Sequence, residues 1–185
     1  MNKRSLFEST ALVRRFGRDG RGVSAVEFAL IAPLLVTIYF AGIEVTTAVA
    51  VDRKMTLVAH TVADLVAQSS SITNSEMTDI LNAAAAVSSP YTTTNLKVTV
   101  SSVTINSSNA ATIAWSDTLN GTRHTVGETV TLPTALNIAD SSLIWGEVTY
   151  TYRPMFGTVI KSNLTLGDAI YMRPRISATV ARTTN

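Results

Sequence analysis

The chain has 185 residues, a formal net charge of +2 and no cysteine, and 46% of its residues are hydrophobic. The positive charge belongs to the N-terminus: residues 1–22 contain six basic and two acidic side chains, whereas residues 23–185 contain nine basic and eleven acidic ones. A net charge of −2 on the larger part argues against a nucleic-acid-binding domain, and the lack of cysteine excludes disulfides and thiolate metal sites.

Residues 23–43 form an apolar stretch of membrane length. As a helix, the stretch would rise by about 31 Å, close to the hydrocarbon thickness of a bilayer. Glu27 is its only charged residue, and Glu44 follows it directly. By the positive-inside rule, the basic residues before it predict a cytoplasmic N-terminus and an exported remainder.

The helical pattern continues beyond the apolar stretch. Apolar residues recur at helical spacing from Met55 to Val66 while charged residues occupy other positions, which indicates an amphipathic outer half. We predict one helix from Ser24 to about Gln68, ended by the serines at 69–71.

A capping box precedes a second predicted helix. Thr73 and Glu76 have the spacing at which side chain and backbone exchange hydrogen bonds, and Ile72 and Met77 are placed as a hydrophobic staple. This helix is expected to end at about Val87.

From Leu96 onward, apolar residues alternate with polar ones, and many are β-branched or aromatic, which is typical of strands. The predicted strand positions are Leu96, Val98 and Val100; Val103 and Ile105; Ile113 and Trp115; Val126, Val130 and Leu132; and Val148, Tyr150 and Tyr152. Asn120-Gly121 indicates a turn within a longer loop. A final pair of strands is predicted over residues 169–173 and 176–181. Helices followed by a mainly antiparallel sheet give an α+β fold.

These elements divide the chain into four predicted segments. They are a basic leader over residues 1–22, a transmembrane helix over 23–44, its periplasmic extension over 45–68, and an exported α+β domain over 69–185.

Residues 22–28 are the most informative motif. A carboxylate inside a membrane segment costs about 2.5–3.5 kcal/mol on insertion scales, so Glu27 is expected to have a function and a partner. The basic leader ending in Gly22, followed by Val23, Glu27 and Phe28, resembles the processing site of type IV prepilins. The resemblance implies that a membrane prepilin peptidase cuts after Gly22 and leaves Val23 as the new N-terminus.

The resemblance narrows to one branch of these proteins. Residues 26–35 are similar to the N-terminal segment of the TadE-like minor pilins of tight-adherence (Tad, or Flp) pilus systems, and residues 114–116, 130–133 and 147–154 are also similar to that family. It implies a non-enzymatic minor pilin, or pseudopilin, acting in pilus assembly, initiation or surface adhesion. The implied partners are prepilin peptidase, other TadE- or TadF-like minor pilins, the major Flp pilin and the inner-membrane assembly platform. The implied location is the inner membrane, crossed once, with the C-terminal domain in the periplasm or on the pilus surface.

Cleavage would give Glu27 a partner. The new α-amine at Val23, with a reference pKa of about 7.7–8.0, is largely cationic near neutral pH. In a bundle of parallel helices, Glu27 of one subunit can neutralise the Val23 amine of its neighbour and so fix their stagger. Further along the helix, Pro33 removes the amide that would bond to the carbonyl of Ala29, which predicts a kink.

Two alternatives remain for the N-terminus. Residues 48–50 satisfy the small-x-small pattern of signal peptidase, which would make Val51 the mature start, although Glu44 separates this site from the apolar run. The other alternative is an uncleaved anchor in which Glu27 snorkels to the interface. It would tether a periplasmic binding or sensor module.

No pattern indicates an enzyme, a cofactor or a metal. His60 and His124 are the only histidines, neither has metal-ligand spacing, and a helix-surface pair of His60 with Asp64 is expected instead. No Gly-x-Ser-x-Gly or His-Glu-x-x-His motif is found. Four aromatic strand residues are expected to be buried or half-buried rather than to form an exposed binding strip: Trp115, Trp145, Tyr150 and Tyr152.

Overall fold

The computed structural model describes residues 21–157 and 160–183. By its internal contacts the chain divides into an N-terminal unit, Met1–Ile43, and a C-terminal unit, Glu44–Asn185. The C-terminal unit combines helices with a mainly antiparallel sheet, so the predicted α+β class is confirmed.

The first described element is the helix α2, Arg21–Ala67, which agrees closely with the predicted helix from Ser24 to about Gln68. It is the one described helix that is long and apolar enough to cross a membrane, with a mean hydropathy of 2.0 over its most apolar 18 residues, none of which is buried. The helix continues through Pro33, and the Thr37 hydroxyl donates to the Pro33 carbonyl over 2.8 Å. This bond satisfies a polar side chain inside the apolar segment.

The part of α2 from Glu44 onward belongs to the C-terminal unit. Its buried residues recur every three or four positions, as expected of a helix packed on one side. They are Ala48, Val51, Met55, Val58, Ala59, Val62, Ala63, Val66 and Ala67. This stripe includes the predicted Met55 and Val66 and extends the pattern toward the membrane segment.

The helix α3, Asn74–Val87, begins at the predicted capping box. The Thr73 amide donates to Glu76 Oε2 over 2.8 Å, and the Glu76 amide donates to Thr73 Oγ1 over 3.3 Å. The hydrogen bond from the Thr73 backbone is the main reason why the pKa of Glu76 lies below its ordinary value. Ile72 and Met77, the predicted staple, are both buried in the main core.

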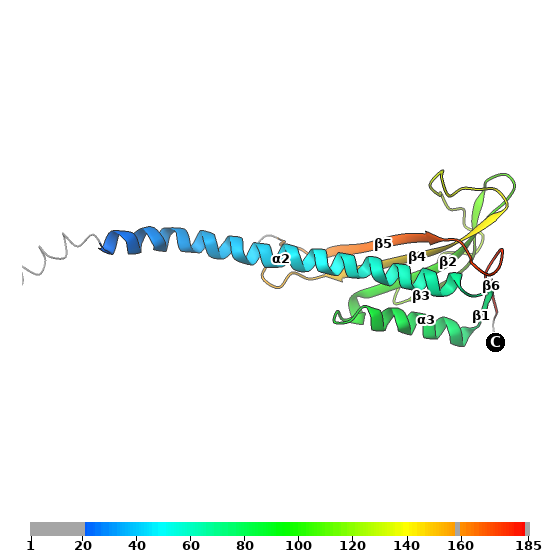
Figure 1. The fold of residues 1–185 in the computed structure, drawn as a ribbon, viewed down its shortest axis with the longest axis horizontal. Coiled ribbons are helices and arrows are strands. Elements are labelled where there is room, and N and C mark those ends of the chain that lie inside the picture. Colours follow the sequence, from blue (N-terminus) through cyan, green and yellow to red (C-terminus); the bar gives the residue numbers. More distant parts are fainter. Residues whose placement is uncertain (1–20, 158–159, 184–185) are drawn as a thin grey trace, which may run out of the picture. The chain divides into compact units, whose positions relative to one another are not determined.

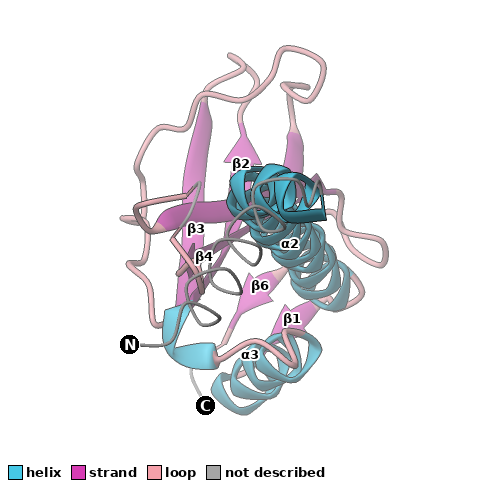
Figure 2. Cartoon of the chain, turned by 90° about the vertical axis from the view of Figure 1, so that its left-hand side faces the viewer, coloured by secondary structure: helices cyan, strands magenta, loops and turns pink. Residues whose placement is uncertain are grey.

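Four strands form an antiparallel sheet in the order β3-β2-β4-β5. Their bounds are β2, Leu96–Ile105; β3, Ala111–Leu119; β4, Ser141–Tyr152; and β5, Leu164–Met172. A short 3₁₀ helix, η1, Thr93–Asn95, precedes β2. In Figures 1 and 2, α3 and the outer half of α2 lie against the sheet, and residues of both helices share the main core with β2 and β4.

Strand β2 buries side chains on both faces of the sheet. Leu96, Val98 and Val100 belong to the main core, whereas Val103 and Ile105 belong to a second cluster with Leu132 and Leu143. Because side chains alternate between faces, the change from even to odd positions places the second set on the opposite face. The two sets, residues 96–100 and 103–105, were predicted as separate runs and belong to one continuous strand.

A bulge separates Ile113 from Trp115, which were predicted as members of one alternating set. Val103 pairs with Ile113 while the adjacent Ser102 pairs with Trp115, so Ala114 is an extra residue in β3. The bulge reverses the facing of the strand. Ile113 consequently lies in the second cluster and Trp115 in the main core.

Two strand predictions were wrong. Around Val126 the described chain forms a turn, with Gly127 at φ +83° and a single isolated bridge between Thr112 and Thr129. Residues 176–181 are mostly bends, because the chain leaves the sheet after β5 through Pro174. The chain next forms a strand in β6, Ala181–Arg182, which pairs in parallel with β1, Ser71–Ile72.

Candidate processing and assembly site

The predicted processing residues form the exposed beginning of α2. Val23 is 60% and Phe28 67% exposed, and Glu27 is also exposed. A Cβ atom added at Gly22 would meet no atom within 4 Å. Val23 and Glu27 lie one helical turn apart on the same side. Except for its last two residues, the predicted leader, residues 1–22, lies outside the described residues.

The predicted scissile bond lies in the first described turn of α2. Extending Arg21 to Ser24 would break the hydrogen bonds that the amides of residues 25–28 donate to their carbonyls, and it would leave the later turns of the helix intact. Glycine adds further backbone freedom at Gly22. A protease that binds an extended chain can therefore act at this bond while the rest of α2 stays helical.

Glu44 is a buried carboxylate whose contacts sequence reasoning missed, because the residue was assigned to the end of the transmembrane segment. Its side chain is 1% exposed. Its Oε1 atom accepts hydrogen bonds from the amides of Phe156, over 3.0 Å, and Gly157, over 2.5 Å. The buried carboxylate thus fixes the connection between β4 and β5 to α2.

The surroundings of Glu44 explain why a carboxylate is tolerated there. Hydrogen bonds to a charged acceptor are stronger than those between neutral groups and compensate part of its lost hydration. Gly157 adopts φ +61°, a left-handed conformation that favours glycine. Burial, followed by the nearby charge of Glu44, raises the pKa of Tyr152. Glu44 and its two donors are 112 and 113 residues apart in the chain, so no local sequence pattern predicts the contact.

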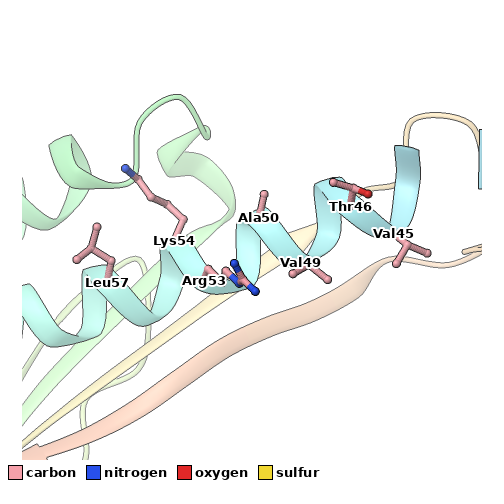
Figure 3. A pocket seen from close by; sticks show the side chains of 7 residues that line it. All are labelled: Val45, Thr46, Val49, Ala50, Arg53, Lys54 and Leu57. Atoms are coloured by element: carbon pink, nitrogen blue, oxygen red, sulfur yellow. The ribbon is translucent and has the colours of Figure 1, made fainter. Parts of the chain in front are cut away.

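Beyond Glu44, α2 presents an open apolar surface with a basic rim. A groove of about 680 Å³ is lined by Val45, Thr46, Val49, Ala50, Arg53, Lys54 and Leu57. Figure 3 shows these side chains along successive turns of the helix. Val45, Val49 and Leu57 are each about half exposed, although they lie on a helix whose other side is core. Such a surface can pack against another apolar helix.

A second polar site lies on the sheet face away from α2. His124 Nε2 is 2.6 Å from Glu147 Oε2, and the imidazole stacks on Trp145 with ring centroids 4.7 Å apart. Tyr171 stacks on Trp145 over 5.6 Å. A pocket of about 200 Å³ opens beside His124 and Glu147. In the part of the chain that the structure describes, no cluster of three metal-ligating side chains occurs.

The outcome for the other singled-out residues is mixed. The four aromatic residues are buried or half-buried as predicted: Trp115, Trp145, Tyr150 and Tyr152. Asp64, the expected partner of His60, instead forms an ion pair with Arg175 and accepts a hydrogen bond from Gln68 Nε2. This pairing joins α2 to the segment after β5.

Residues 22–64 match the family model described as TadE-like protein. The match confirms the resemblance predicted from residues 26–35, and it begins at Gly22 and ends within the packed outer half of α2. It indicates involvement in the Tad pilus system, and with the apolar helix it is consistent with a membrane anchor. No curated protein and no solved structure matches the chain.

Proposed function

We propose that this chain is a minor pilin, or pseudopilin, of a Tad (Flp) type IV pilus. It would be cut by prepilin peptidase after Gly22 and would act in pilus assembly, initiation or surface adhesion as a structural component rather than an enzyme. The observation that carries the proposal is the motif Gly22, Val23, Glu27 and Phe28, exposed at the start of an apolar helix within the matched residues.

The arrangement of α2 supports an assembly role. Its apolar segment and the groove beyond Glu44 are exposed in a single chain, so both offer surface to neighbouring helices. The expected neighbours are other minor pilins and the major Flp pilin. The assembly platform would bind the same segment in the inner membrane. In such a bundle the amine of Val23 and the carboxylate of Glu27 belong to different subunits.

The N-terminal sequence of the protein isolated from membranes tests the proposal. A start at Val23 supports processing by prepilin peptidase, and a start at Met1 supports the uncleaved anchor carrying a binding or sensor module. A start at Val51 would mean a secreted domain. That product would lack both Glu44 and Ala48, which are buried in the C-terminal unit.

A pair of glycine variants locates the cut. Gly22→Leu is expected to block maturation, because the site would no longer fit a cleft that requires close approach of the backbone. Gly42→Leu is the matched control, since Gly42 lies on the same helix and also has no atom within 4 Å of an added Cβ. Normal processing of Gly22→Leu in the presence of the peptidase would overturn the site assignment.

A further inference from the structure

The connection between β4 and β5 exposes two large apolar side chains in succession. Met155 is 83% and Phe156 43% exposed, and the exposed Arg153 precedes them. Most other large exposed hydrophobic residues belong to α2, and Val126, Ile138 and Ile176 lie singly in other connections. Isolated exposed apolar residues are ordinary, whereas an adjacent Met–Phe pair offers a compact apolar surface.

The position of this pair is fixed by Glu44. The amides of Phe156 and Gly157 both donate to the buried carboxylate, so the backbone beside Met155 is held against α2 at this residue. Glu44 directly follows Ile43, where the predicted apolar segment ends. The exposed pair is therefore held beside the residue that directly follows that segment in the chain.

We propose that Met155 and Phe156 insert into the outer leaflet of the membrane that α2 crosses, with Arg153 at the phosphate headgroups. The inference rests on the proposed function, because it requires α2 to span the bilayer. Apolar side chains beside a basic residue are the usual composition of an interfacial membrane contact. Glu44 makes this contact part of the folded domain, since it joins the inserting segment to the helix.

A second point of membrane contact would have two consequences. The C-terminal unit could no longer change its tilt freely at the membrane, so its sheet would face the membrane in one orientation. Entry into a pilus would require Met155 and Phe156 to leave the lipid, which would favour retention of the unassembled subunit in the membrane. The proposed partner is lipid, because Glu44, which binds the connection that carries this pair, directly follows the membrane segment in the chain.

The experiment uses single-cysteine variants of the full chain, which has no natural cysteine. Met155→Cys carries an environment-sensitive fluorophore in vesicles of phosphatidylethanolamine and phosphatidylglycerol containing a brominated lipid. Ile176→Cys is the matched control, because Ile176 is 70% exposed in another connection, and Tyr39→Cys reports the apolar segment. We expect a blue shift and strong quenching at positions 155 and 39, and neither at position 176.

The outcomes separate this inference from the proposed function. Quenching at position 39 but not at 155 would overturn the loop insertion and leave the membrane anchor intact. Equal quenching at 155 and 176 would mean that the domain lies on the bilayer nonspecifically, which also overturns it. Lack of quenching at 39 would overturn the membrane anchor itself, and the loop insertion with it.

A variant of Glu44 tests the linkage between the carboxylate and the loop. Glu44→Ala removes the acceptor for the amides of Phe156 and Gly157, so quenching at position 155 is expected to fall while that at position 39 is unchanged. Glu44→Gln keeps a carbonyl oxygen and should retain more of the quenching. Undiminished quenching at position 155 in Glu44→Ala would show that Glu44 does not position the loop.

Discussion

Two carboxylates, Glu27 and Glu44, illustrate how the same residue type can be used in opposite ways. Glu27 is exposed one turn from Val23, where it is available to a second chain. Glu44 is 1% exposed and already accepts two backbone hydrogen bonds within its own unit. The donors of Glu44 come from the connection after β4, whereas the proposed function would give Glu27 a donor from another subunit.

The first prediction concerns Glu27. Glu27→Gln is expected to leave cleavage after Gly22 largely intact and to reduce incorporation into pili, because the amide cannot neutralise the Val23 amine of a neighbouring subunit. Immunoblotting of membrane and sheared pilus fractions measures both steps. Asp52→Asn, at another exposed position of α2, is the control. A loss of cleavage equal to the loss of incorporation would assign Glu27 to peptidase recognition instead.

At the scale of elements, α2 and α3 are defined mainly by local signals. The apolar run and the periodic stripe predicted α2 to within a few residues, and the capping box predicted the start of α3. Both signals depend on residues within a turn or two of each other. A helix closes its own hydrogen bonds, so its existence can be inferred from its own segment.

The second prediction concerns the capping box. Thr73→Ala is expected to lower the free energy of unfolding by about 1 kcal/mol, because it removes the side-chain acceptor of the Glu76 amide. Thr78→Ala is the control, since the Thr78 hydroxyl bonds only back to Asn74 within α3. Chemical denaturation of the full chain in detergent, followed by circular dichroism, measures both. An equal effect of the two variants would contradict the cap.

The same cap predicts a pH dependence. The pKa of Glu76 is lower in the folded chain than its ordinary value of 4.5. Its contribution is therefore fully present above pH 4.5 and is lost as the pH falls through the lowered folded pKa. Glu76→Gln should remove this part of the acid dependence, measured as the difference in unfolding midpoint between acidic and neutral pH. An unchanged acid dependence would contradict the assignment.

At the scale of the whole molecule, the C-terminal unit is held together by contacts between segments distant in sequence. Gly146 in β4 allows a close approach between α2 and the sheet: a Cβ atom there would lie 3.1 Å from the Ala59 carbonyl oxygen and from Ala63 Cβ. The Trp115 indole donates to the Val180 carbonyl over 2.7 Å, and Arg182 Nε donates to Asp117 over 2.7 Å. These contacts connect the C-terminal segment to the sheet.

The fourth prediction tests this packing. Gly146→Val is expected to destabilise the fold by about 1–3 kcal/mol, because the larger side chain overpacks the interface between α2 and β4. Ala169→Val, at an exposed position of β5, is the control and should change stability little. Urea denaturation of the full chain in detergent compares them. Equal stabilities of Gly146→Val and the parent chain would contradict the close packing of helix and sheet.

The sequence by itself determined what depends on neighbouring residues: the length of α2, the cap of α3, the alternation in β2 and β4, and the motif around Gly22. Tertiary structure decided what depends on distant segments. Glu44 gained its donors from the connection after β4, the bulge at Ala114 set the facing of Trp115, and β1 paired with β6 from the far end of the chain. Local patterns fix hydrogen bonds within a helix and the period of a strand, whereas the partners of a buried charge or a strand edge are chosen only when the chain folds.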